Sequence, residues 1–201
     1  MYEIDNSKPT SIETASSIFA AIGAFILSSI EAIVIALAIS VVLYLLFMTP
    51  HEVVGTSMVP TFQNGEHLIA NKIIYKISKP NRGDIIIFKY SDTEDFIKRI
   101  IGLPGDTIQV KDGKYYVNGN ALDESNYLDS SVYTSGGQYL HEGETITVPA
   151  NMYWVSGDNR PHSSDSRDFG PINFSAIKGK VWLVYFPFNQ ARFVKHATYP
   201  N

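Results

Sequence analysis

Apolar residues follow two different patterns along this chain, and the pattern changes near residue 49. Between Ile18 and Met48 the chain carries a single charged side chain, at Glu31. A helix that crosses a bilayer needs about 20 predominantly apolar residues. The segment therefore predicts a membrane-spanning helix within residues 18–48. Glu31 is expected near the boundary of the hydrocarbon, because a carboxylate at its centre is costly.

Two other interpretations of the apolar segment compete with a membrane span. A removable signal peptide has a basic start and an apolar core of about 7–15 residues, whereas this segment is longer and follows an acidic, polar leader at residues 1–17. A buried core helix is rarely apolar over so many consecutive residues. The span is favoured, and Ile18–Ile30 either extends a tilted helix or lies in the interface. Lys8 precedes the span and no Lys or Arg follows it before Lys72, which leans towards a cytoplasmic N-terminus.

After residue 49 the apolar residues come in short runs between turn residues, which predicts a β-rich domain over residues 49–201. Asp112-Gly113 between two such runs is a strong hairpin signal. The runs typical of strands are Asp84–Lys89, Thr107–Val110, Tyr115–Val117, Thr145–Val148, Met152–Ser156 and Lys180–Phe186. The expected fold class is mainly β: a single N-terminal transmembrane helix, then a mostly antiparallel, partly barrel-like β domain. A polar, Gly/Ser-rich insertion is expected near residues 123–144.

Composition excludes several kinds of function. The 201 residues have a net charge of -4 with scattered Lys and Arg, so no nucleic-acid-binding surface is expected. The absence of cysteine excludes disulfides, thiolate metal sites and cysteine nucleophiles. The polar loop at residues 156–170 matches no EF-hand spacing and contains one His, so no metal site is predicted.

Ser57 is the first candidate catalytic residue, in the segment Gly55-Thr56-Ser57-Met58-Val59-Pro60. Glycine permits a close backbone approach and proline restricts the chain after the turn. The expected result is an exposed, rigid hydroxyl with its own backbone N–H free to face an oxyanion. A lone serine in a surface turn is far commoner, and the spacing is not that of the α/β-hydrolase nucleophile elbow.

Lys98 is the second candidate, and it is followed by Arg99 in an apolar strand. Alternate residues of a strand share a face, so one of these cations lies on the apolar side unless the strand is at an edge, where lysine opposes aggregation. Burial disfavours an ammonium group, and a neutral lysine can take the proton of a serine hydroxyl. Taken alone, the strand favours the edge interpretation.

Together these segments resemble the type I signal peptidases, the membrane-bound Ser/Lys endopeptidases that remove signal peptides from exported proteins. The order and spacing match over nearly the whole chain. The four segments that carry the resemblance are Gly55–Pro60, Arg82–Phe88, Lys98–Asp106 and Gly157–Gly170.

The resemblance implies a role for each matching residue. Ser57 would be the nucleophile and Lys98 the general base, with Ser163 orienting the Lys98 amine and Asp165 pairing with Arg167 to hold the loop. It implies cleavage of signal peptides after small residues (Ala-x-Ala) through an acyl-enzyme, without a cofactor. It also implies a catalytic domain against the outer face of the cytoplasmic membrane, in contact with the lipid bilayer.

The oxyanion hole departs from one pattern of the family. Some members carry a serine two residues before the nucleophile, and its hydroxyl is an oxyanion donor. Gly55 occupies that position here, as it does in Gram-positive-type members. The hole then consists of the Ser57 backbone N–H and a second donor that the sequence does not identify.

Three alternatives remain beside this resemblance. A LexA-like self-cleaving repressor would need an N-terminal DNA-binding domain, but a membrane span and a polar leader stand in its place. A histidine-based hydrolase would use His162, which is close to Asp165 in sequence. A catalytically inactive, membrane-anchored β domain would only bind peptides, and would have no need for all of the motif residues.

Overall fold

The computed structural model describes residues 11–199. Residues 1–10 of the predicted leader, including Lys8, lie outside the described residues. The chain divides into two compact units, a helical one that ends at Leu46 and a β one that begins at Phe47.

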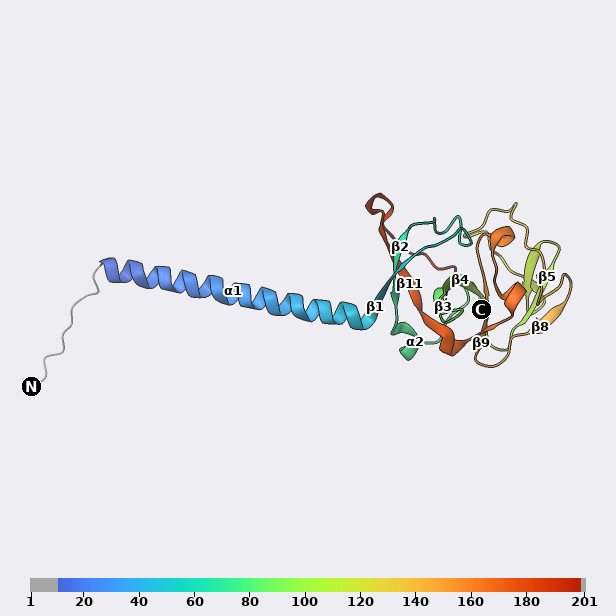
Figure 1. The fold of residues 1–201 in the computed structure, drawn as a ribbon, viewed down its shortest axis with the longest axis horizontal. Helices are drawn as coiled ribbons and strands as arrows, with labels where there is room; N and C mark the ends of the chain where they lie inside the picture. Colours follow the sequence, from blue (N-terminus) through green and yellow to red (C-terminus); the bar gives the residue numbers. More distant parts are fainter. Residues whose placement is uncertain (1–10, 200–201) are drawn as a thin grey trace, which may run out of the picture. The chain divides into compact units, whose positions relative to one another are not determined.

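The helical unit is one continuous helix, α1 (Ser11–Phe47) (Figure 1). Ile18–Ile30 therefore extends the same helix as the apolar run after it. Its most apolar part, Phe19–Tyr44, has 26 residues and a mean hydropathy of 2.6, and none of it is buried within the protein. At ~1.5 Å per residue this length suffices to cross a bilayer. A helix that is apolar on all sides and unburied in its own chain matches a lipid environment.

The β unit contains a large sheet in which every pairing is antiparallel, in the order β1-β2-β11-β3-β4-β9-β10, with β12 paired to β11. The sheet curls into a half-barrel (Figure 1). Its strands are β1 (Met48–Glu52), β2 (His67–Asn71), β3 (Ile85–Lys89), β4 (Asp95–Gly102), β9 (Met152–Ser156), β10 (Ile172–Asn173), β11 (Ile177–Phe186) and β12 (Arg192–Phe193). The mostly antiparallel β fold expected from the sequence is confirmed.

A second, four-stranded sheet has the order β7-β6-β5-β8. Its strands are β5 (Thr107–Lys111), β6 (Lys114–Val117), β7 (Asn120–Ala121) and β8 (Thr145–Thr147). The predicted hairpin joins β5 to β6, and Asp112 and Gly113 both have positive φ, 51° and 76°. Short helices complete the unit: α2 (Ile74–Ile77), η1 (Arg160–His162), α3 (Ser166–Phe169), η2 (Phe174–Ala176) and η3 (Phe188–Gln190).

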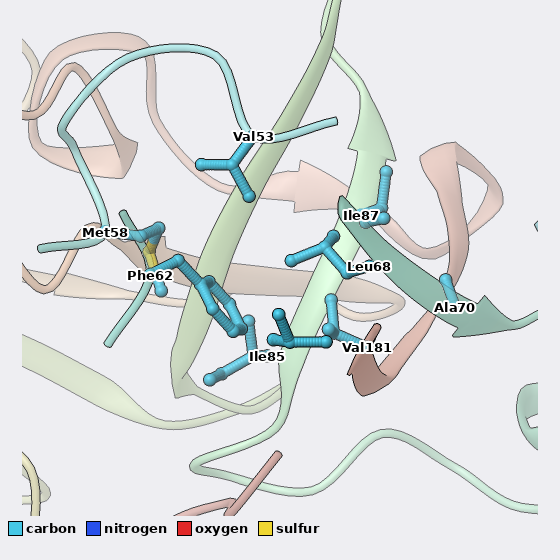
Figure 2. Close-up of a cluster of buried hydrophobic side chains, with 9 residues drawn as sticks. Val53, Met58, Phe62, Leu68, Ala70, Ile85, Ile87 and Val181 are labelled. Carbon is cyan, nitrogen blue, oxygen red and sulfur yellow. The ribbon is translucent and has the colours of Figure 1, made fainter. Parts of the chain in front are cut away.

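Strand β3 is buried on both faces, which explains its unbroken apolar sequence. Ile85 and Ile87 point into one core, with Met58 and Phe62 (Figure 2). The alternate residues of β3 point into a second core on the other face. Because β3 pairs with β4 along residues 95–99, this double packing fixes the strand that carries Lys98.

Strand β4 lies between β3 and β9, but it pairs with β9 only from Arg99 onward, so Lys98 is in the half of β4 that pairs with β3 alone. A lysine that protects an edge against aggregation keeps its ammonium in solvent, whereas the Lys98 side chain is buried. Both cations of β4 are buried, with Lys98 3% exposed and Arg99 1% exposed. Sheet alternation sends the two side chains to opposite faces, so each face of the strand buries a basic group.

The polar segment expected as an insertion near residues 123–144 has little regular structure, but it is not a simple solvated loop. Leu128, Thr134 and Leu140 are buried, and Leu140 belongs to the core between β5, β6 and β9. The segment therefore packs into the domain through a minority of its residues.

Candidate active site

The turn that carries Ser57 is anchored on both sides by buried side chains. Val53 is 4% exposed and Met58 is 2% exposed, and both point into the core (Figure 2). The Gly55 N–H donates to Asn64 Oδ1 at 2.7 Å, with the Gly55 backbone at φ +98°, in the left-handed region. These anchors leave Ser57 half-buried on a turn with little freedom to move.

The structure brings Lys98 to Ser57, 41 residues apart in sequence. Lys98 Nζ lies 2.7 Å from Ser57 Oγ, within hydrogen-bond distance. The Phe96 ring lies on the same face of β4, with its centroid 5.0 Å from Nζ. A serine hydroxyl and a buried amine at this distance have the geometry that covalent catalysis by serine requires.

Burial lowers the pKa of Lys98 from its ordinary value of 10.5 to about 8. The carboxylates of Asp165 and Asp158 oppose this effect by favouring the ammonium form, while the Arg167 guanidinium adds to the lowering. Desolvation dominates because the amine is surrounded by protein and β4 is covered on both faces. A substantial fraction of the amine is therefore neutral at mildly alkaline pH.

Asp165 organises the polar loop from its centre, and its side chain is fully buried. It accepts hydrogen bonds from the Gly157 N–H and the Ser156 hydroxyl, both at 3.0 Å. Its other partner is Arg167, whose Nε donates at 2.8 Å. Burial alone would raise the pKa of Asp165, but the bonds and charge of Arg167 outweigh burial and hold the pKa below its usual range. The predicted pairing of Asp165 with Arg167 is present.

The same loop also holds the turn that carries Ser57, through Asn159. The Asn159 backbone N–H donates to the Ser57 carbonyl at 3.0 Å, and its side-chain amide donates to the Thr56 carbonyl at 3.1 Å. This clamp between loop and turn was not foreseen from the sequence, where Asn159 is one polar residue among many. The only local signal is its place beside Gly157 in the last of the four matching segments.

Gly157 lies where the loop and the turn come closest. A Cβ atom at this position would be 2.2 Å from Ser163 Oγ and 2.5 Å from the Ser57 carbonyl oxygen. Both distances are far below van der Waals contact, so only glycine allows this approach. Gly157 thus determines how near the loop comes to the turn that carries Ser57.

Ser163 lies beside the site without the contact proposed for it. Its Oγ is buried and has no hydrogen-bond partner among the described residues. It packs against Gly157, on the same side as Ser57. An orienting role for Ser163 toward Lys98 stays a prediction.

His162 is exposed, and no hydrogen bond joins it to Asp165 within the described part of the chain. The carboxylate of Asp165 is instead directed to Arg167 and Gly157. The arrangement of base and orienting carboxylate that a histidine-based hydrolase needs is therefore not assembled here.

A groove of about 330 Å³ opens beside Ser57 and Lys98. Its walls come from β1 and the chain after it, and from the first half of β4. The lining residues include His51, Val53, Ile87, Phe96 and Ile97. β1 is the last strand of the sheet, and β4 pairs with β9 only from Arg99 onward. Both walls thus present strand edges to the groove.

The Ser57 backbone N–H, which the sequence proposes as an oxyanion donor, donates to no other group within residues 11–199. Its role as a donor stays a prediction. The Gly55 N–H, in contrast, donates to Asn64 Oδ1.

Comparison with known proteins places the chain in a family. The sequence profile described as "Signal peptidase, peptidase S26" matches residues 26–186. Signal peptidase I of Bacillus caldolyticus is 40% identical over 168 residues, which covers 79% of this chain and 91% of that protein. Signal peptidase I of Bacillus licheniformis is 36% identical over 168 residues, with 81% and 90% covered. Signal peptidase IB of Staphylococcus aureus strain MRSA252 is 33% identical over 179 residues, with 84% and 93% covered. The chain therefore belongs to the signal peptidases of peptidase family S26.

Proposed function

We propose that this signal peptidase cleaves preproteins with Ser57 as nucleophile and Lys98 as general base. The observation that carries the proposal is the 2.7 Å distance between Lys98 Nζ and Ser57 Oγ, at a lysine that is 3% exposed. The neutral amine favoured by burial can accept the hydroxyl proton. No cofactor is required, because nucleophile and base both come from the chain.

The reaction then proceeds in two halves. Lys98 takes the Ser57 proton as Oγ attacks the scissile carbonyl, and the Ser57 N–H donates to the oxyanion. The tetrahedral intermediate collapses to an acyl-enzyme, and the amine of the mature protein leaves with the proton from Lys98. Lys98 next takes a proton from water, which attacks the ester. The signal peptide leaves as a carboxylic acid, and Ser57 regains its proton.

The groove supports a substrate bound in an extended conformation. Its walls are strand edges of β1 and β4, which offer backbone N–H and C=O groups to an added strand. In such a strand alternate side chains point the same way, so residues one and three positions before the cut face one wall. The signal peptidases that the chain resembles have shallow pockets for small side chains, which implies Ala-x-Ala at these positions.

Ser163, Asp165 and Arg167 support the dyad in this proposal. A buried hydroxyl without a partner is energetically costly, and rotation of the Ser163 Oγ toward the Lys98 amine would relieve this cost while orienting the base. Asp165 and Arg167 hold the loop that presents Ser163. These three are positioning residues rather than participants in bond-making.

Helix α1 is the proposed anchor. Its exposed apolar surface, together with substrates that are exported proteins, points to the cytoplasmic membrane with the β unit on the outer side. The lipid bilayer and the signal peptides of preproteins are thus the expected partners.

A synthetic signal-peptide substrate tests this function. Detergent-solubilised protein should cut an Ala-x-Ala peptide after the second alanine, with the site mapped by mass spectrometry. Replacing that alanine by Leu should lower kcat/KM by about 100-fold, because the proposed specificity is for a small side chain at this position. Equal cleavage of both peptides would contradict the small-residue preference. Binding without cleavage would instead favour an inactive peptide-binding domain.

The pH dependence follows from the base. Lys98 must be neutral, so kcat/KM should rise with pH and level off above about 8, the pKa of the buried amine. Below that pH the rate should fall about tenfold per unit. Initial rates between pH 5.5 and 10 measure this fall, which is the acid limb of the pH–rate profile. An acid limb with its midpoint near the ordinary histidine pKa would point to a different base.

A further inference from the structure

Arg99, the residue after Lys98, has a fully enclosed guanidinium. Its Nε and Nη2 donate to the two carboxylate oxygens of Asp158 at 2.9 and 2.7 Å. Its Nη1 donates to the Gly83 carbonyl at 3.1 Å. The Tyr127 ring covers the guanidinium, with its centroid 3.8 Å from Cζ. Its Nη2 also lies 3.4 Å from Thr61 Oγ1, so four segments far apart in sequence contact this one cation.

Tyr127 is itself held from two sides. Its hydroxyl donates to Glu124 Oε1 at 2.5 Å and accepts a hydrogen bond from the Tyr199 hydroxyl at 2.9 Å. Burial raises the pKa of Tyr127, which keeps the phenol neutral and able to donate. The ring over Arg99 is thus tied to the polar segment near residue 124 and to the C-terminal tail.

Glu124 also fixes a second buried arginine, Arg160. The Glu124 carboxylate accepts from Arg160 Nη1 and Nη2 at 2.8 and 2.5 Å. Arg160 Nε donates to the Gly157 carbonyl at 2.9 Å. Glu124 is therefore connected to the polar loop at residues 156–170 in two ways. One connection is direct, through Arg160, and the other runs through the Tyr127 ring to Arg99 and Asp158.

The tail that carries Tyr199 follows a fixed route across the domain. His196 lies between two strands, where its Nδ1 accepts from the Ile85 N–H at 3.0 Å and its Nε2 lies 3.0 Å from the Val181 carbonyl. These partners require a neutral ring with the proton on Nε2. Ala197 packs onto the turn at Gly83, where an added Cβ would be 2.0 Å from the Ala197 carbonyl oxygen. The contacts of His196 and Ala197 thus fix the tail in the position where Tyr199 contacts Tyr127.

We propose that Glu124, Tyr127 and Tyr199 form a brace that positions the Ser57–Lys98 pair. The proposal rests on the function proposed above for Ser57 and Lys98. None of the three brace residues has a place in the reaction steps, so they are positioning residues. They make the polar segment and the C-terminal tail necessary for full catalytic rate.

The path from brace to dyad is short and continuous. The brace fixes Arg99, and Arg99 fixes the Asp158 carboxylate. The next residue, Asn159, donates to the Ser57 carbonyl at 3.0 Å. A face-on aromatic contact with a desolvated guanidinium is stronger than one at an exposed site. Loss of this contact should loosen Asp158, and through Asn159 the turn that aims Ser57.

Graded variants of Tyr127 test the brace. Tyr127→Leu removes both the ring and the hydroxyl, and should lower kcat by about 10-fold or more, since small misplacements of reacting groups have large effects on rate. Tyr127→Phe and Tyr199→Phe keep the rings and should lower kcat by roughly 3-fold. KM should change less than about 2-fold, because the brace residues do not line the groove. Tyr133→Leu is the matched control, in the same polar segment but 59% exposed, and should keep wild-type rates.

The pH profile separates positioning from a general loss of stability. The charged groups that act on Lys98 are Asp165, Asp158 and Arg167. When Arg99 neutralises Asp158 less well, the Asp158 carboxylate acts more strongly on the Lys98 amine and favours its ammonium form. The acid limb of Tyr127→Leu should therefore move upward from about 8 towards 10.5. A variant that is only less stable keeps the wild-type limb in its folded fraction.

Each outcome decides the proposal. If Tyr127→Leu folds, keeps the wild-type kcat and shows the wild-type acid limb in its pH–rate profile, the brace is overturned. If Tyr127→Leu does not fold, the two Phe variants decide the question. If both hydroxyls act through the same series of contacts, the double variant Tyr127→Phe/Tyr199→Phe should lower kcat no more than the larger of the two single variants does. Fully wild-type rates in both Phe variants would then overturn the brace. If the wild type fails to cleave, the proposed function fails, independently of the brace.

Discussion

Ser57→Ala and Lys98→Ala should each abolish cleavage of an Ala-x-Ala peptide, with kcat/KM reduced by at least about 1,000-fold. Ser57 supplies the only oxygen within hydrogen-bond distance of Lys98 Nζ among the described residues, and the amine is the only base placed to take its proton. Removal of either group leaves the other without its reaction partner. Initial rates of peptide cleavage in detergent, followed by chromatography, measure the loss.

Three further variants make this test specific. Lys98→Arg should not restore activity, because a guanidinium stays protonated at any working pH. Lys98→Met keeps the apolar stem within the buried site and should be inactive yet folded. His162→Ala is the control, since His162 lines the same groove but is exposed and apart from Asp165, and it should stay within about 3-fold of wild type. Substantial cleavage by Lys98→Met would show that lysine is not the base.

Gly157→Ala should lower kcat by about 100-fold and destabilise the fold by about 1–3 kcal/mol. The new methyl group would lie 2.2 Å from Ser163 Oγ and 2.5 Å from the Ser57 carbonyl oxygen. The Ser163 hydroxyl can rotate away, but the Ser57 carbonyl is backbone and is held by the Asn159 N–H. The loop must therefore move away from the nucleophile turn. Cleavage kinetics and urea unfolding of the same preparation measure the two effects.

Gly143→Ala is the matched control for the steric argument. Gly143 has φ +78°, so alanine there is strained, but nothing lies within 4 Å of an added Cβ. This variant should lose about 1 kcal/mol of stability with little change in kcat. If Gly157→Ala behaved in the same way, the close approach of loop and turn would have no role in catalysis.

Features fixed by neighbouring residues were predicted well from the sequence. Asp112-Gly113 specifies its turn locally, because both residues accept positive φ, and the β5–β6 hairpin follows. The strand Met152–Ser156 has the predicted bounds. β1 and β2 were missed, because each is short and mixes polar and apolar residues. Their strand character comes from pairing with each other and with β11, which no local pattern encodes.

The candidate site shows the same division between local and distant information. Alternation along β4 predicted one cation on an apolar face, but the structure buries both. Arg99 is buried because Asp158, 59 residues away, neutralises it, and Lys98 is buried beside Ser57. The contacts of Glu124 and Tyr127 were likewise beyond sequence reasoning. Polar residues in a Gly/Ser-rich stretch look solvated until their partners across the fold are known.

The unpaired first half of β4 has a consequence for which peptide bonds are at risk. Residues 95–98 pair with β3 alone, so the place beside them accepts a strand only if that strand has unpaired backbone of its own. A segment already within a helix or sheet has none to offer. On the proposed function, the enzyme therefore discriminates by conformation as well as by side chain. Folded domains are spared even where their sequences contain alanine at the required spacing, and freshly exported, still extended chains are cut.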